Sequence, residues 1–172
     1  MIRSYRGVTP QIASSAFVED SAQVIGDVVI GGDSSIWFNT VVRGDVNYIR
    51  IGARTNIQDG SVLHVFKDLY PLVIGDDVTV GHGCVLHGCT IENRCLISMA
   101  AVVLNGARIG TGSIVAAGAV VTENTIVPPR SLFLGLPAKF FRHLTDEDQK
   151  VIDQYAARYV EYKEVYLSER GQ

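Results

Sequence analysis

The feature that most constrains this sequence is an aliphatic residue that returns every six positions. Neither the helical period of 3.6 residues nor the alternation of a half-buried strand produces this spacing. The run is interrupted by two insertions and slips once by one residue. Its members are Ile12, Val18, Val24, Ile30, Ile36, Val42, Ile51, Ile57, Leu63, Ile74, Val80, Leu86, Ile91, Ile97, Val103, Ile109, Val115, Val121 and Val127. The pattern indicates an internal repeat, which decides the fold before any single element is assigned.

Each six-residue unit has the composition of a short strand followed by a turn. The residue two before the aliphatic is usually small, as at Ser34 and Ala101, and Gly or Asp often follows it. Both inward positions then alternate with outward ones. Three units make a triangular coil, and stacked coils make a parallel β-helix. The three cysteines occupy the small inward position, so we expect packing residues rather than disulfides: Cys84, Cys89 and Cys95.

The segment after the repeat predicts an exit turn and a helix. The repeat stops near Val127-Pro128-Pro129, and residues 135–139 are rich in turn formers. Thr145 to Asp148 has the pattern of a helix N-cap with an acid three residues later. An apolar stripe at helical spacing follows: Val151, Ile152, Tyr155, Tyr159, Val160 and Tyr166. We therefore expect one domain over residues 1–172, with a β-helix at 11–134, an exit turn at 135–145 and a helix at 146–167 packed along the coils.

Charge and hydropathy exclude several classes of function. The 172-residue chain has a net charge of −3 and no run of Lys or Arg, which argues against nucleic acid. No apolar run approaches the roughly 18 residues of a membrane helix. The first six residues are too polar for a signal peptide. We expect no nucleic-acid or membrane partner and a cytoplasmic location.

Three of the four histidines suggest a metal site. His82 and His87 lie five residues apart, each beside a glycine, and His64 precedes them by eighteen. Three imidazoles are the ligand set of a catalytic zinc with one position open for water. The fourth, His143, follows the repeat and is expected to have no such role.

The repeat predicts where these histidines point. Residues three units apart lie on the same face of adjacent coils, about 4.8 Å apart. The residues directly after Val42, Leu63 and Leu86 should therefore form one outward stack, which is Arg43, His64 and His87. Two residues after Ile36, Ile57 and Val80 come the members of a second stack, Phe38, Asp59 and His82, with Gln58 just before Asp59.

These two stacks predict a site between subunits. One chain could hardly bring His82 around its own prism to meet His64 and His87. Two neighbouring chains could do so through a heterologous contact, which closes as a ring. A triangular prism suits a three-fold ring, so we expect a homotrimer with three metal sites. Arg43 and Asp59 would then meet as an intersubunit ion pair that fixes register.

At this point the sequence resembles the gamma class of carbonic anhydrases. The matching residues are Arg43-Gly44-Asp45, Asn56-Ile57-Gln58-Asp59, His64, His82 and His87, and the repeat, exit turn and terminal helix match as well. The resemblance implies a left-handed coil and a zinc ion, with iron or cobalt as alternatives, bound by the three histidines across a trimer interface. It implies that Gln58, in a motif with Asn56, contacts metal-bound water. It also implies that Arg43, Asp45 and Asp59 order the site, and that Tyr159 reaches the pocket.

The implied activity is reversible hydration of CO2 to bicarbonate by a metal-bound hydroxide. Met99 and Leu104 fall at outward positions one coil beyond the histidines, where they could wall a CO2 pocket. The chain departs from the best-known members in residues 65–71, a short loop without the glutamate that shuttles protons, and at Val46. It resembles the shorter branch of the family, in which anhydrase activity is often weak. Asp68 or buffer would then export the proton.

Three alternatives remain open from the sequence. A hexapeptide acyltransferase shares the coil and the exit Gly135-Leu136-Pro137-Ala138-Lys139, but it needs one catalytic histidine rather than three. A metal-dependent acyl-CoA thioesterase would use the same metal-activated water on a thioester. A non-catalytic trimeric assembly protein would retain the metal without turnover.

Overall fold

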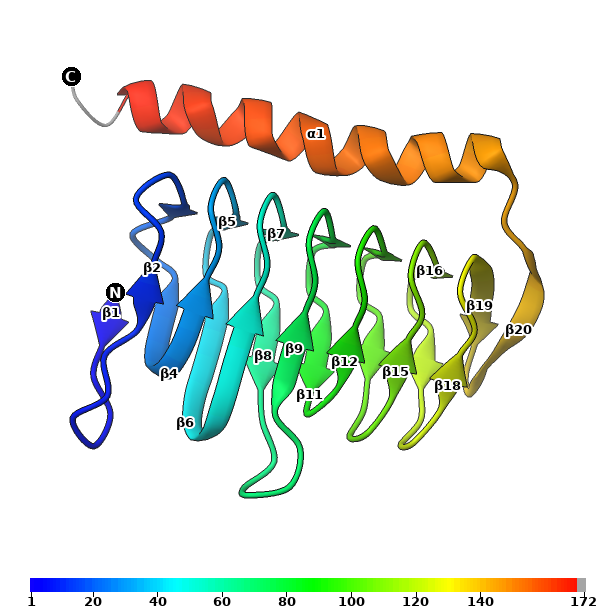
Figure 1. The fold of residues 1–172 in the computed structure, drawn as a ribbon, viewed down its shortest axis with the longest axis horizontal. Helices are drawn as coiled ribbons and strands as arrows, with labels where there is room; N and C mark the ends of the chain where they lie inside the picture. Colours follow the sequence, from blue (N-terminus) through cyan, green and yellow to red (C-terminus); the bar gives the residue numbers. More distant parts are fainter. Residues whose placement is uncertain (170–172) are drawn as a thin grey trace.

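The computed structural model describes residues 1–169 and is a left-handed parallel β-helix with one long helix along its side (Figure 1). The expected fold class is thereby confirmed. The coils advance from the N-terminus to a C-terminal hairpin, and α1 (Asp146–Glu169) returns along the whole stack. No helix within residues 1–169 is long and apolar enough to cross a membrane.

The short strands form three faces of a triangular prism. Face 1 contains β1 (Ile2–Arg3), β8 (Val62–His64), β11 (Val85–His87), β14 (Val102–Val103) and β17 (Val120–Val121). Face 2 contains β2 (Gln11–Ile12), β9 (Leu72–Ile74), β12 (Thr90–Ile91), β15 (Arg108–Ile109) and β18 (Ile126–Val127). Face 3 contains β3 (Phe17–Val18), β5 (Ser35–Ile36), β7 (Asn56–Ile57), β10 (Thr79–Val80), β13 (Leu96–Ile97), β16 (Ile114–Val115) and β19 (Ser131–Gly135).

Two long strands join faces 1 and 2 near the N-terminal end. β4 (Gln23–Ile30) and β6 (Val41–Ile51) pair in parallel along both faces. The first part of β6 pairs with β8, and its last part pairs with β9. The first insertion in the repeat therefore lies within a strand, whereas the second is the loop between β8 and β9.

The core is the column of repeat aliphatics and small residues. From Val24 to Val127 every aliphatic of the repeat is buried, and the three cysteines are buried and free. Ile12 and Val18 are only partly buried. At the first coil Phe17 is buried instead of Val18, because its ring packs against Trp37 and Tyr166.

The exit from the repeat contains more structure than its sequence predicts. Residues 135–145 were expected to be a turn, but β20 (Ala138–His143) pairs antiparallel with β19 there and closes the last coil. The antiparallel partner satisfies backbone groups that a parallel stack would leave free at its end.

The helix begins with the predicted capping pattern. Thr145 Oγ1 accepts a hydrogen bond from the amide of Asp148, and the Asp148 carboxylate accepts one from the amide of Thr145. This reciprocal pair is a capping box, and it satisfies two amides that the helix cannot. Arg142 also donates to Asp148, with its Nη1 2.6 Å from Oδ2.

The helix docks on face 3 through a stripe that differs from the predicted one. Its buried residues are Gln149, Ile152, Ala156 and Lys163, whereas Val151, Tyr155 and Tyr166 remain substantially exposed. The coil corners offer carbonyl and carboxylate oxygens beside apolar surface, so polar side chains are buried there. Gln149 Nε2 donates to the Gly112 carbonyl at 2.7 Å, and Lys163 Nζ lies 3.2 Å from Asp33 Oδ1.

Candidate metal centre

His64 and His87 lie on face 1 in direct register. β11 pairs with β8 so that His87 is opposite His64, one coil away. β6 pairs with β8 with Val42 opposite Leu63, so Arg43 follows in the same column. The shared stack that the repeat predicted is therefore present, because the buried leucines set the register and the outward neighbours follow it.

The two imidazoles present ring nitrogens to each other. Nδ1 of His64 lies 3.1 Å from Nε2 of His87. Two nitrogens bound to one tetrahedral zinc at 2.0–2.1 Å would lie about 3.3 Å apart. The spacing of these two nitrogens thus fits two ligands of one metal ion with little rearrangement.

Each of the three histidines has its other ring nitrogen beside an oxygen acceptor. Nε2 of His64 lies 2.9 Å from Asp45 Oδ1, and Nδ1 of His87 lies 2.7 Å from Asn105 Oδ1. Nδ1 of His82 lies 2.9 Å from Asp59 Oδ2. Metal-binding histidines characteristically donate their second N–H to a carboxylate or carbonyl oxygen, which fixes the ring and its tautomer. The donor set of this chain therefore fits a metal.

The charges around His64 favour an ionised carboxylate beside a neutral imidazole. Burial acts to raise the pKa of Asp45, but hydrogen bonds from His64 and Arg43 together hold that pKa below its usual value. Burial lowers the pKa of His64 and outweighs the hydrogen bond to Asp45. Arg43 Nη1 lies 2.5 Å from Asp45 Oδ2. A neutral imidazole is the form that can bind a metal.

His82 lies at the corner between face 3 and face 1, across face 1 from His64 and His87. It follows β10, stacks one coil beyond Asp59, and its carbonyl accepts a hydrogen bond from the amide of Ala100. Its side chain is 48% exposed. Within residues 1–169 no group of three or more His, Cys, Asp or Glu side chains is close enough to hold a metal together. A single subunit thus presents two histidines at one corner and the third at another.

Gln58 lines a cavity beside His82. Its Nε2 donates to Asn56 Oδ1 at 3.1 Å, and Asn56 Nδ2 donates to Thr79 Oγ1 at 2.9 Å. Gln58 is 5% exposed. The cavity has a volume of about 310 Å³ and is lined by Gln58, Thr79, Gly81, His82, Leu96, Ser98, Met99, Tyr155 and Tyr159. The chain thus brings the predicted Gln58, Tyr159 and Met99 together with His82.

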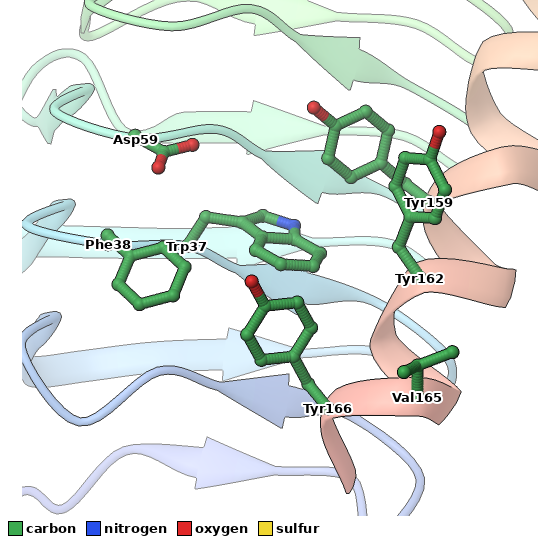
Figure 2. Close-up of a pocket in the computed structure, with 7 residues that line it drawn as sticks. All are labelled: Trp37, Phe38, Asp59, Tyr159, Tyr162, Val165 and Tyr166. Atoms are coloured by element: carbon green, nitrogen blue, oxygen red, sulfur yellow. The ribbon is translucent and has the colours of Figure 1, made fainter. Parts of the chain in front are cut away.

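An aromatic pocket adjoins this cavity. It has a volume of about 320 Å³ and is lined by Trp37, Phe38, Asp59, Tyr159, Tyr162, Val165 and Tyr166. Figure 2 shows the helix side chains projecting toward those of the coil, with Tyr159 and Tyr166 near Trp37. Burial, followed by the charge of Asp59, raises the pKa of Tyr159 to about 12. The phenol is therefore protonated at neutral pH and can donate a hydrogen bond.

Other predicted residues lie apart from this cavity. Leu104 follows β14, in the outward column of His64 and His87. Asp68, in the loop, lines a separate surface cavity of about 350 Å³ with Asp45 and Val46.

Sequence reasoning missed Asn105 and the cavity role of Tyr155. A signal for Asn105 was present, because Leu86 and Ile91 are five residues apart, whereas Val103 and Ile109 are six apart. The unit that contains Asn105 is therefore one residue longer than the unit it stacks on, which contains His87. For Tyr155, only the docking of the helix determines which ring faces His82.

This chain is similar to proteins that are named carbonic anhydrases and to proteins that are named hexapeptide transferases. A family profile described as bacterial transferase hexapeptide (six repeats) matches residues 88–123. A carbonic anhydrase of Geobacillus kaustophilus is 48% identical, over 96% of this chain and 91% of its own. Gamma carbonic anhydrase 2, mitochondrial, of Arabidopsis thaliana is 44% identical, over 95% of this chain and 60% of its own.

Solved structures share the whole architecture. The crystal structure of a hexapeptide transferase family protein from Anaplasma phagocytophilum superposes with a TM-score of 0.92 at 41% identity. The superposition covers 96% of this chain and 97% of that one.

Proposed function

Because the chain belongs to the gamma carbonic anhydrase family of hexapeptide-repeat proteins, we propose that it is a zinc-dependent enzyme that interconverts CO2 and bicarbonate. Its site is formed between subunits of a homotrimer. His64 and His87 come from one subunit and His82 from the next. Iron or cobalt at the same ligands would be compatible with the proposal.

The observation that carries this proposal is the state of the three histidines. Each has one ring nitrogen held by an oxygen of Asp45, Asn105 or Asp59, and His64 and His87 direct their remaining nitrogens toward one point. A surface histidine without a ligand role does not require an oxygen acceptor at a particular ring nitrogen. A metal-binding histidine typically has one at the nitrogen that does not face the metal.

The outer surface of face 1 supports an assembled form. Its outward positions carry a column of valines in register: Val41, Val62, Val85, Val102 and Val120. Val62 and Val85 are 40% and 38% exposed in the single subunit. A contiguous apolar column beside two histidines suits burial against a neighbouring subunit.

Zinc, when bound, acts as a Lewis acid and makes water nucleophilic near neutral pH. The residues of the chain then position the reactants. Gln58 donates its amide N–H to Asn56, and its carbonyl oxygen, for which no donor is found among residues 1–169, can accept a hydrogen bond from the attacking water and orient it. Tyr159 can donate a hydrogen bond from its phenol O–H to a carboxylate-like product, and Met99 provides an apolar wall for CO2.

Proton export is assigned to the loop side of the site. Asp45 bridges Arg43 and His64, and it lines a surface cavity together with Asp68. The Asp68 side chain is 82% exposed, so it is open to buffer. The loop lacks a glutamate, and proton export through a single aspartate would limit turnover.

The relatives named transferases make acyl transfer the rival activity. The specific observation against it is that three histidines carry dedicated acceptors, while acyl transfer needs one base. Metal content, CO2 hydration, acyl-CoA hydrolysis and acetyl transfer measured on one preparation test the proposal. Zinc at about one per subunit with hydration activity is expected. Acetyl transfer without hydration in the zinc-loaded protein would overturn it.

A further inference from the structure

The amide of Asn105 bridges His87 and the exposed carboxylate of Glu123. Oδ1 of Asn105 lies 2.7 Å from Nδ1 of His87, and Nδ2 lies 2.9 Å from Oε1 of Glu123. The three residues come from three successive coils on the same side of the prism, since β11 pairs with β14 and β14 with β17.

The Glu123 carboxylate sets the polarity of the contacts as far as His87, while the Asp45 carboxylate sets that of His64 separately. An ionised glutamate is an acceptor without a proton to donate, so it must face the NH2 of the Asn105 amide. The amide oxygen therefore faces His87. An oxygen acceptor there requires the hydrogen of a neutral His87 to sit on Nδ1, which leaves the lone pair of Nε2 directed at His64.

The backbone at Gly88 leaves room for the Asn105 side chain in this place. Gly88 has a φ of +56°, and a Cβ on it would lie 2.6 Å from Asn105 Oδ1 and 2.7 Å from Tyr70 Cβ. The amide of Gly106 donates to the Gly88 carbonyl at 2.8 Å. The tight turn after His87 thus leaves space for the Asn105 carboxamide that a side chain on residue 88 would take.

We propose that Asn105, oriented by Glu123, is a positioning residue that sets the tautomer of His87 so that Nε2 faces the metal. Its consequence for metal affinity rests on the proposed function, but its effect on the tautomer does not.

Three variants separate the relay from general packing. Asn105→Leu removes the acceptor at similar volume. Asn105→Asp keeps an oxygen beside His87 Nδ1. Glu123→Lys replaces the acceptor of Glu123 with a donor, so the amide should turn round and present its NH2 to His87. Glu161→Lys, an exposed change on the helix, is the matched charge control.

The tautomer is read from the ring ¹⁵N shifts of His87 in metal-free protein, assigned by comparison with His87→Gln. The wild type, Asn105→Asp and Glu161→Lys should show the Nδ1–H form. Asn105→Leu should show mixed tautomers, and Glu123→Lys should shift toward Nε2–H. Zinc affinity, measured by chelator competition, should fall by about 10- to 100-fold in Asn105→Leu and be retained in Asn105→Asp.

An unchanged tautomer in both Asn105→Leu and Glu123→Lys overturns the proposal, as does an Asn105→Asp protein that behaves like Asn105→Leu. If Asn105→Leu does not fold, the surface variant Glu123→Lys decides the question. A wild type that binds no zinc would overturn the proposed function, while the tautomer comparison would still test the relay.

Discussion

His82 lies one coil beyond Asp59, with its Nδ1 2.9 Å from Asp59 Oδ2, at the corner where face 3 turns into face 1. His64 and His87 are the last residues of β8 and β11, at the opposite edge of face 1. The distribution of these ligands over two corners has direct consequences for assembly and metal binding.

Removal of one ligand should empty the site without unfolding the coil. In His87→Ala we expect bound zinc near zero by elemental analysis, with an unchanged far-UV spectrum, because stacked coils are held by neighbour contacts. His143→Ala is the matched control, since His143 lies on β20 and packs against Phe140. Full zinc in His87→Ala would contradict the ligand assignment.

Mixed trimers should reveal which subunit supplies which ligand. His64→Ala and His82→Ala should each lack zinc as pure trimers. After joint refolding in equal amounts, about one interface in four should pair an intact His64 face with an intact His82 corner and regain zinc. A mixture of His64→Ala and His87→Ala should regain none, because both changes lie on the same face. Equal zinc in the two mixtures would argue against a shared site.

Gln58 should affect turnover more than metal content. We expect Gln58→Ala to bind zinc normally and to lose about 10- to 100-fold in CO2 hydration, since it removes the acceptor that orients the attacking water. Stopped-flow hydration assays give the rate, and Gln11→Ala on face 2 provides the control. If Gln58→Ala hydrated CO2 at the wild-type rate, Gln58 would have a packing role only.

The capping box should make stability depend on pH below about 5. Hydrogen bonds from Arg142 and the Thr145 amide hold the pKa of Asp148 well below its usual range. A carboxyl with a depressed pKa stabilises the fold above its unfolded pKa of about 3.9, and this contribution is lost as the pH falls toward the folded pKa.

Asp148→Asn should therefore lower the melting temperature at pH 7, and the difference from wild type should shrink between about pH 5 and pH 3. Glu147→Gln, with a side chain 80% exposed, should show little difference at either pH. If the difference in melting temperature between Asp148→Asn and wild type stayed constant with pH, the charge of Asp148 would not be the cause of the stabilisation.

The three cysteines should be inert in the folded protein. Burial raises the pKa of Cys84 to about 11 and those of Cys89 and Cys95 to about 12. At pH 8 these thiols are protonated and buried, so almost no thiol should react with a thiol reagent until denaturant is added. Rapid modification under native conditions would show that the coil opens locally.

The repeat was sufficient to predict the coil, its three faces and the stacking of His64 with His87. The physical reason is that each inward aliphatic, from Val24 to Val127, fills the same column, and a slip of one residue would turn it outward. Outward neighbours then follow without further information. The capping box could be predicted for the same kind of reason, because Thr145 and Asp148 interact locally.

The remaining features depended on the tertiary structure. The contact between Asn105 and His87 arises from a turn shortened at Gly88, and the hairpin of β19 and β20 arises because the last coil needs a partner. The helix buries Gln149 and Lys163 rather than Val151, since the oxygens of the coil corners select its rotation. Side chains that reach between elements depend on where those elements dock, and no periodicity in the sequence records that position.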